Sequence, residues 1–200
     1  MNKGIFISVE GPNGTGKSTF IKELSTKLSR CFPVTVTREP TETPFGEFVK
    51  RNEGALKGME YARLIWADRY YHIQQFILPA LAEKKIVISD RYIESSIVLQ
   101  GFDGVPVDQV WELNKDFIIP DISIILLADN NLLADRLQQR DALSDFEKRM
   151  TRNQETEGYR IAADFLAGKG FRHLIFQNNT KEDLEKSIID VIDVIISTIG

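Results

Sequence analysis

The sequence has 200 residues, of which 25 are Lys or Arg and 29 are Asp or Glu, so its formal net charge is −4. This length favours one domain, and a mildly acidic chain is a poor candidate for binding nucleic acids or membrane surfaces by general charge. A single cysteine excludes an intrachain disulfide, and two distant histidines argue against a zinc site. Without a basic leader or an apolar stretch of membrane-spanning length, we expect a cytoplasmic protein with no membrane partner.

Short apolar runs alternate with longer segments of helical spacing. The runs that predict strands are Ile5–Val9, Val34–Thr37, Ile86–Ile88, Ile122–Leu127 and His173–Phe176. Nearly continuous apolar strands are typical of a parallel sheet that is buried on both faces. Helices are expected at Lys17–Ser29, at Met59–Ala82, where Pro79 should kink or end the last turn, and at Ser187–Thr198. This alternation predicts an α/β fold with right-handed crossovers.

A glycine-rich segment between the first expected strand and the first expected helix matches the phosphate-loop pattern G-x-x-x-x-G-K-[ST]. Its glycines let backbone N–H groups face phosphate oxygens, and the helix N-terminus adds partial positive charge. We expect Lys17 to reach the β- and γ-phosphates of a nucleoside triphosphate and Ser18 to ligate Mg²⁺. The predicted triphosphate site comprises Gly11, Pro12, Asn13, Gly14, Thr15, Gly16, Lys17, Ser18 and Thr19. The pattern alone does not distinguish a kinase from a GTPase or an ATPase.

Charged residues follow two further strands. Asp90 follows the third expected strand, where a carboxylate can hold Mg²⁺ directly or through water. Arg91, beside it, is expected to face another anion, and Arg38 follows the second strand in the same way. Arg69 lies in the middle of the long helix, where a surface ion pair with Asp68 or a neighbouring glutamate is the alternative.

In this order, the segments resemble those of the thymidylate kinases, a family of nucleoside monophosphate kinases. The resemblance covers nearly the whole chain and rests on Val9–Ser18, Thr37–Pro40, Ala67–Arg69, Asp90–Tyr92 with Ser95 and Gln100–Gly101, and Pro120–Asp121. It implies the P-loop NTPase fold, a three-layer sandwich with a five-stranded parallel sheet flanked by helices and a small lid. It also implies that residues 1–200 form a single kinase domain, with a mobile lid at about 138–157.

The same resemblance implies phosphoryl transfer from Mg-ATP to a deoxynucleoside monophosphate, with dTMP as the expected acceptor and dTDP as the product. The expected partners are ATP, the monophosphate and a second copy of the chain in a homodimer, with Mg²⁺ as cofactor and no nucleic acid. Arg38, Arg69 and Arg91 would hold the acceptor phosphate, Gln100 would lie near the base, and Asp90 would serve the metal and the transferring group. The predicted acceptor site comprises Arg38, Ile65, Arg69, Arg91, Ser95, Leu99 and Gln100.

Four positions depart from the family pattern, and all of them touch the expected acceptor pocket. Ile65 and Leu99 stand where aromatic residues are usual, Asn13 stands where an acidic residue is usual, and Thr41 begins a segment unlike the common Gly-Gly-Thr. Trp66 points about 100° away from Ile65 on a helix and is expected in the core. The alternatives are therefore a kinase for another or modified nucleotide or a nucleoside, or a nucleotide-binding regulatory module without acceptor activity.

The expected lid should supply cations to the transferring phosphoryl group, because the phosphate loop has Gly14 where some relatives carry an arginine. We expect Arg136 to lie against the adenine and Arg140 near the phosphates, with Arg149 as a third cation. The alternative for each is a solvated ion pair. The expected catalytic residues are Lys17, Asp90, Arg91, Arg140 and Arg149. We expect Lys17, Arg38, Arg69, Arg91 and the lid arginines to converge on one cleft, which gives one basic pocket on an acidic body.

Overall fold

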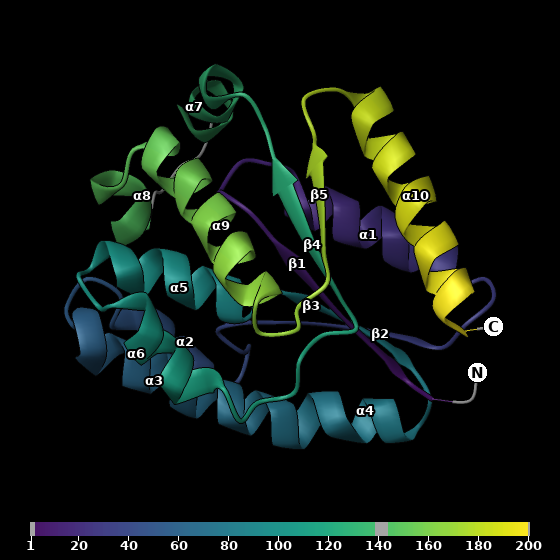
Figure 1. The fold of residues 1–200 in the computed structure, drawn as a ribbon, viewed down its shortest axis with the longest axis horizontal. Coiled ribbons are helices and arrows are strands. Elements are labelled where there is room, and N and C mark those ends of the chain that lie inside the picture. Colours follow the sequence, from purple (N-terminus) through teal and green to yellow (C-terminus); the bar gives the residue numbers. More distant parts are fainter. Residues whose placement is uncertain (1–2, 139–143, 200) are drawn as a thin grey trace.

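The computed structural model describes residues 3–138 and 144–199. Five strands form one parallel sheet in the order β2-β3-β1-β4-β5 (Figure 1). They are β1 (Ile5–Glu10), β2 (Val34–Arg38), β3 (Ile86–Asp90), β4 (Ile122–Leu127) and β5 (His173–Gln177). The sequence therefore predicted every strand of this sheet to within two residues at either end, and the five-stranded parallel sheet is confirmed.

Helices cover both faces of the sheet, so the three-layer architecture is confirmed (Figure 1). One face is covered by α1 (Lys17–Leu28) and α10 (Lys181–Ile199). The opposite face is covered by α3 (Gly58–His72), the π-helix η1 (Ile73–Ile77), α4 (Leu78–Ala82), α5 (Ile93–Phe102), α6 (Val107–Asn114) and α9 (Arg152–Ala167). Three further helices complete the described residues, namely α2 (Pro44–Arg51), α7 (Asn130–Gln138) and α8 (Asp145–Arg149).

Each strand sends alternate side chains into the two faces of the sheet. On β1, Ile5, Ile7 and Val9 pack in the cluster that contains α1 and α10, whereas Phe6 packs in the cluster that contains α5 and α9. All four side chains are buried. Burial on both sides explains why the sequence shows continuous apolar runs rather than an alternating pattern.

The helix expected at Met59–Ala82 is continuous but changes its winding before the proline. The last turn of α3 is followed by η1, after which the Leu78 N–H bonds to the Ile73 carbonyl five residues earlier. Pro79 follows in the first turn of α4, where it has no N–H to bond to the preceding turn. The sequence predicted a kink or a helix end at Pro79. The structure instead has a π-helical turn just before this proline, and the helix continues to Ala82.

The carboxyl ends of the strands position the functional residues. Where β1 ends, the chain turns at Gly11, whose φ is +133°. A Cβ at this position would lie 2.1 Å from the Leu126 carbonyl oxygen of β4, so only glycine fits this close approach. Where β3 ends, Arg91 takes a φ of +76°, a left-handed conformation that is costly for a residue with a side chain.

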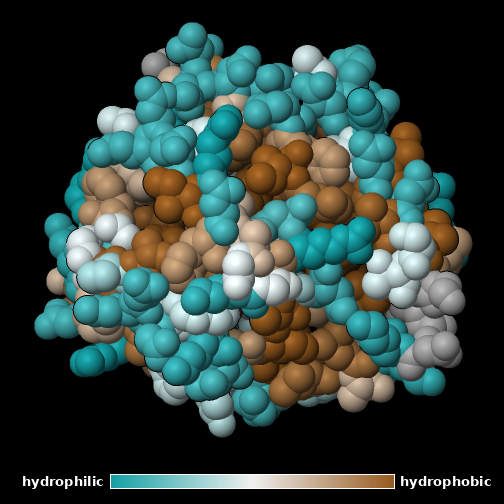
Figure 2. Space-filling view, in the orientation of Figure 1, coloured by the Kyte–Doolittle hydropathy of each residue, from teal (hydrophilic) through white to brown (hydrophobic). Residues whose placement is uncertain are grey.

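The surface in the orientation of Figure 1 is mostly hydrophilic, with apolar patches between the polar side chains (Figure 2). Over the described part of the chain, no helix is both long and apolar enough to cross a lipid bilayer.

Candidate active site

The phosphate loop, Gly11–Ser18, wraps around the side chain of Lys17. The Lys17 Nζ donates hydrogen bonds to the carbonyls of Gly11 at 2.7 Å and Pro12 at 2.9 Å. Burial, and then the neighbouring positive charge of Arg91, lower the pKa of Lys17 to about 7. A bound phosphate would reverse this effect, because an anion favours the charged form of the amine.

Two side chains from other elements contact the outer side of the phosphate loop. Arg136 of α7 donates to the Gly14 carbonyl at 3.0 Å, which places it beside the predicted triphosphate site. Asn178, which follows β5, donates from Nδ2 to the Thr15 carbonyl at 2.6 Å. Sequence reasoning missed Asn178, although its place at the carboxyl end of a strand was the signal that singled out Asp90 and Arg38.

Ser18 and Asp90, the two predicted metal ligands, line the same cavity of about 560 Å³. The Asp90 Oδ1 is buried without a hydrogen-bond partner among the described residues. A buried carboxylate oxygen without a partner is the kind of atom that a cation satisfies. One carboxylate and one hydroxyl, completed by substrate phosphates and water, suit Mg²⁺, so these residues fit the ion.

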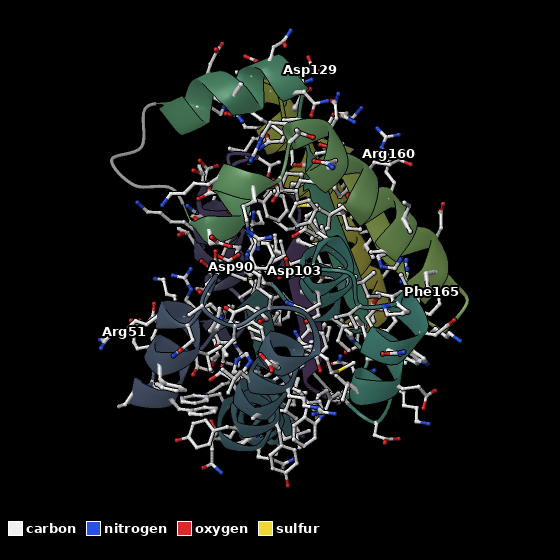
Figure 3. The ribbon with its side chains drawn as sticks, turned by 90° about the vertical axis from the view of Figure 1, so that its left-hand side faces the viewer. Arg51, Asp90, Asp103, Asp129, Arg160 and Phe165 are labelled. Carbon is white, nitrogen blue, oxygen red and sulfur yellow. The ribbon has the colours of Figure 1, made fainter. Side chains whose placement is uncertain are left out.

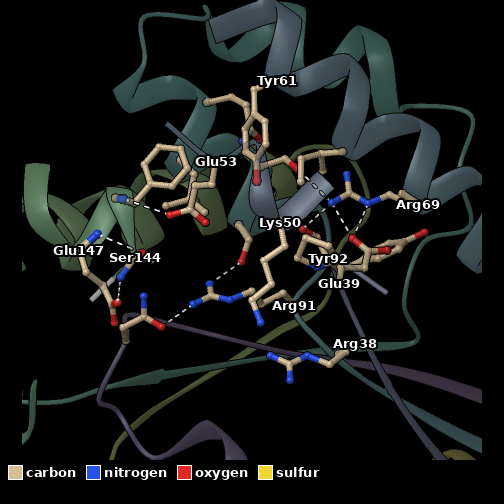
Figure 4. Close-up of a pocket in the computed structure, with 18 of the residues that line it drawn as sticks. Arg38, Glu39, Lys50, Glu53, Tyr61, Arg69, Arg91, Tyr92, Ser144 and Glu147 are labelled. Atoms are coloured by element: carbon tan, nitrogen blue, oxygen red, sulfur yellow. Dashed lines mark hydrogen bonds and ion pairs between the residues drawn. The ribbon is translucent and has the colours of Figure 1, made fainter. Parts of the chain in front are cut away.

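A second cavity, of about 280 Å³, has Arg91 among its lining residues (Figure 4). We call it the acceptor pocket. Its walls come from the ends of β2 and β3 and from α2, α3, α5 and α8, which are far apart in the sequence. The pocket is lined by all seven predicted acceptor residues, Arg38, Ile65, Arg69, Arg91, Ser95, Leu99 and Gln100.

Arg91 is held by three different elements of the fold. Its Nη1 donates to Ser95 Oγ of α5 at 3.0 Å and to the Tyr159 hydroxyl of α9 at 2.7 Å. Its Nη2 donates to Asn13 Oδ1 of the phosphate loop at 2.8 Å. Because Asn13 lies in the loop and Ser95 lines the acceptor pocket, Arg91 stands between the two predicted binding sites.

Glu10 fixes the turn that directs Arg91 into the pocket. This carboxylate is fully buried at the end of β1 and accepts the Tyr92 N–H at 2.5 Å and the Ser95 hydroxyl at 2.6 Å. Burial, and then the nearby charge of Glu94, raise the pKa of Glu10 to about 8. Both hydrogen bonds join Glu10 to residues that closely follow Arg91 in the sequence, so Glu10 stabilises the left-handed backbone conformation of Arg91.

Arg69 is a wall residue of the pocket rather than a surface cation, and its exposed fraction is 1%. The alternative of a surface pair with Asp68 is wrong, because the carboxylate partner of Arg69 is the buried Glu39, at 2.7 Å. Burial alone would raise the pKa of Glu39, but Arg69 and His72 hold it below its usual value. Four of the five N–H groups of Arg69 bond to Glu39, Asn114, Ser96 and the Tyr92 carbonyl.

The pocket is not basic throughout, contrary to the prediction. Lys17, Arg136 and Arg149 were expected to converge there and do not line it, whereas Arg38, Arg69 and Arg91 do. Lys50 joins these three cations, and five glutamates also line the pocket, namely Glu39, Glu42, Glu47, Glu53 and Glu147. Figure 4 shows that Arg38, Arg91 and the Lys50 side chain gather at one end, away from Glu53 and Tyr61. The pocket thus has one cationic end rather than a uniform basic lining.

Two further predictions on single residues have different outcomes. Trp66 is not a core residue, because it is 37% exposed and stacks on Tyr70 and Phe117 at the surface. Arg149 donates to Asp103 at 2.7 Å and to Asp145 at 2.5 Å, and it does not line the acceptor pocket, so its catalytic role stays a prediction. Arg140 lies outside the described residues.

The site combines a phosphate loop, a carboxylate suited to Mg²⁺ and a second pocket with a cationic end. Arg91 contacts the loop and lines the pocket, and this combination is that of a P-loop nucleotide kinase. The thymidylate kinase family model matches residues 9–188, which is most of the chain. The chain therefore belongs to the thymidylate kinase family.

Individual relatives agree with this assignment. A probable thymidylate kinase of Caldivirga maquilingensis is 42% identical over 149 residues, covering 72% of this chain and 73% of that protein. A thymidylate kinase of Staphylococcus haemolyticus is 38% identical over 166 residues, covering 78% of this chain and 81% of that protein. The crystal structure of thymidylate kinase from Ehrlichia chaffeensis superposes with a TM-score of 0.72 at 26% identity, covering 96% of this chain and 98% of that one. The last match confirms the P-loop NTPase fold.

The buried Glu39–Arg69 pair should dominate the stability of the pocket wall. Glu39→Gln leaves Arg69 buried without its counter-charge, so we expect a loss of about 3–5 kcal/mol in the free energy of unfolding. Because the pKa of folded Glu39 lies below the ordinary value of 4.5, this difference is complete above pH 4.5 and shrinks as pH falls through the folded pKa. Urea unfolding at several pH values measures it.

Glu42→Gln is the matched control, since Glu42 is 78% exposed and pairs with Arg38 at 3.7 Å. We expect it to change the free energy of unfolding by no more than about 0.5 kcal/mol. Equal effects of the two substitutions would contradict a buried pair that stabilises the fold.

The lowered pKa of Lys17 predicts that ATP binding takes up protons. Above pH 7 the free amine is largely neutral, and bound phosphates favour its charged form. At pH 8 we expect an uptake approaching one proton per ATP, falling towards zero at pH 6, and an ATP affinity that weakens as pH rises. Calorimetry in buffers of different ionisation enthalpy measures the uptake, and an enthalpy independent of buffer at pH 8 would refute it.

Proposed function

We propose that this chain is a thymidylate kinase that transfers the γ-phosphoryl group of ATP to dTMP and releases ADP and dTDP. Membership of the family and identities of 36–42% to several thymidylate kinases support this reaction. The observation that carries it is the placement of Arg91, which hydrogen-bonds the phosphate loop through Asn13 and also lines the acceptor pocket. One residue therefore faces both of the anions that must react.

In the proposed reaction, an oxygen of the acceptor phosphate attacks the γ-phosphorus in line, and the bond from that phosphorus to the ADP oxygen breaks. The acceptor is already an anion, so no strong general base is needed, and the difficulty is to bring two anions together. Lys17 would hold the β- and γ-phosphates from the loop, and Arg38 and Arg91 would hold the acceptor phosphate at the cationic end of the pocket. Fixed cations reduce the repulsion without reorganising during the step.

Ser18 and Asp90 would hold Mg²⁺ from the side of their shared cavity. When bound, the ion would neutralise charge on the β- and γ-phosphates. Asp90 and Arg91 are adjacent at the end of β3, yet they line different cavities. This separation leaves the carboxylate to the metal and the guanidinium to the acceptor.

We further propose that residues 138–157 act as the lid over this site. In its described part, the Phe146 N–H of α8 donates to Glu53 Oε1 at 3.2 Å, and Phe146 packs with Tyr61 and Val49. Ser144, Phe146 and Glu147 also line the acceptor pocket, which supports a lid role in which the closed segment would exclude water from the transferring group.

The proposed reaction predicts a specific activity pattern. With Mg-ATP and a panel of dTMP, dUMP, UMP, CMP, AMP, GMP and thymidine, we expect the highest kcat/KM for dTMP. Arg91→Ala should lower kcat/KM by at least about 100-fold, because a guanidinium on the reacting anions is removed. Coupled detection of ADP measures both.

Arg160→Ala is the matched control, because Arg160 is exposed and projects from the outer side of α9 (Figure 3). It should keep kcat/KM within about twofold. Preference for another monophosphate would correct the acceptor, preference for thymidine would favour a nucleoside kinase, and ATP binding without turnover on any acceptor would favour a regulatory module.

We also propose that the chain forms a homodimer through the outward face of α3. Trp66 and Tyr70 on α3 stack with each other, and Trp66 stacks with Phe117 beyond α6. Trp66 is 37% exposed and Tyr70 is 52% exposed, and Leu78 lines the same surface hollow. Clustered exposed aromatic side chains are typical of protein interfaces.

Tyr70→Glu should convert a dimer into a monomer, because it places a charge at the centre of this aromatic face. Sedimentation equilibrium should give about twice the 22.8 kDa chain mass for the wild type and the single mass for the variant. Ile196→Glu is the control, since Ile196 is 53% exposed on α10, in the opposite layer, and should leave the dimer intact. A monomeric wild type, or a dimeric Tyr70→Glu variant, would reject this interface.

A further inference from the structure

Helix α9 carries two buried polar side chains, one helical turn apart, that face the site. Glu155 is 2% exposed and Tyr159 is fully buried. Residues four apart lie on the same face of a helix. The opposite face carries exposed residues such as Glu157 and Arg160, and Figure 3 shows Arg160 on the outer side of α9.

Glu155 joins α9 to the backbone of the phosphate loop. Its Oε1 accepts the Asn13 N–H at 3.1 Å, and its Oε2 accepts from Arg152 at 3.0 Å. Arg152 in turn donates to the carbonyls of Glu147 and Met150, so it also ties α8 to α9. The position of the phosphate loop is therefore linked to α9 and, through Arg152, to α8, which lines the acceptor pocket.

Tyr159 joins the same helix to Arg91. Its hydroxyl oxygen accepts from Arg91 Nη1 at 2.7 Å and lies 3.0 Å from Ser95 Oγ. The single hydroxyl hydrogen of Ser95 goes to Glu10, so the Tyr159 hydroxyl donates to Ser95. Burial raises the pKa of Tyr159, so it keeps the hydrogen that this bond requires.

A third contact closes these two links into a ring, because Arg91 Nη2 donates to Asn13 Oδ1 at 2.8 Å. The ring runs from Glu155 to Asn13, on to Arg91, on to Tyr159 and back along one turn of α9. We call it the α9 ring. Neither Glu155 nor Tyr159 lines the acceptor pocket, so each acts through its partner.

We propose that Glu155 and Tyr159 are positioning residues, which fix the phosphate loop and Arg91 relative to each other so that donor and acceptor phosphates meet in line. This inference rests on the proposed function. Effective transfer requires the reacting atoms to be held close to their final geometry, and small displacements are costly in rate. Because α9 contacts both the phosphate loop and Arg91, it supplies this constraint. Binding of one substrate then favours binding of the other.

The test compares Glu155→Ala, Glu155→Gln and Tyr159→Phe with the wild type, using steady-state kinetics with Mg-ATP and dTMP. Glu155→Ala and Tyr159→Phe should each lower kcat about tenfold, with the ATP dissociation constant unchanged within about twofold. Their combination should cost far less than the product of the two effects, because the ring acts as a unit. Glu155→Gln keeps an acceptor for the Asn13 N–H and should retain most of the wild-type kcat.

A second readout does not depend on the reaction. Hydrogen exchange of the Asn13 amide, followed by NMR, should accelerate in Glu155→Ala but not in Glu155→Gln. Glu157→Gln is the matched control for both readouts, because Glu157 is exposed on the outer face of the same helix.

The outcomes separate this inference from the proposed function. A wild type inactive on dTMP rejects the proposed function, whereas the Asn13 exchange still reports on the Glu155 contact. A wild type active on dTMP, with kcat for Tyr159→Phe and Glu155→Ala within twofold of it, overturns the α9 ring. A Glu155→Gln variant as slow as Glu155→Ala, or an ATP dissociation constant that weakens as much as kcat falls, also overturns it.

Discussion

The backbone turn at Arg91 is the constraint on which the site depends. An extended residue after β3 would continue the strand, whereas a φ of +76° at Arg91 turns the chain towards α5, and Asp90 and Arg91 line two different cavities. Asp90 lines the cavity that contains Ser18, and Arg91 lines the acceptor pocket. Such a conformation is costly for a residue with a side chain, so the surrounding structure must hold it. The Arg91 N–H on the Val9 carbonyl at 3.0 Å and the Glu10 carboxylate on the Tyr92 N–H provide that support.

The arginines of this acidic protein have two different roles in the pocket. Arg69 is neutralised by Glu39 and becomes part of the wall, while Arg38 stays 48% exposed in its side chain, at the open edge of the pocket. The free energy of placing Arg69 in the interior is offset by Glu39, His72 and their hydrogen bonds. The cationic end is thus a local arrangement of Arg38, Lys50 and Arg91, and the net charge of −4 does not oppose it.

The sequence predicted the strands and the positions of most site residues for definite physical reasons. Strands buried on both faces give continuous apolar runs, and the carboxyl ends of parallel strands share one edge, so Arg38 and Asp90 could be placed there. The partners of these residues were not predictable, because Glu39–Arg69 and Glu155–Asn13 join residues 30 and 142 positions apart. Such pairs depend on the packing of helices, which the periodicity of a single helix does not give. The prediction that Trp66 lies in the core was wrong for the same reason, because the exposure of this side chain depends on the neighbouring α6 region and not on α3 alone.

In the proposed enzyme, ATP and the acceptor occupy adjoining sites that meet at Arg91. A compound that joins adenosine to thymidine through a chain of five phosphates would span both sites, and calorimetry measures its binding most directly. We expect one equivalent bound per chain, with an affinity well above those of ATP and dTMP, and loss of that gain in Arg91→Ala. Two equivalents per chain, or an affinity no better than that of ATP in the wild type, would contradict it.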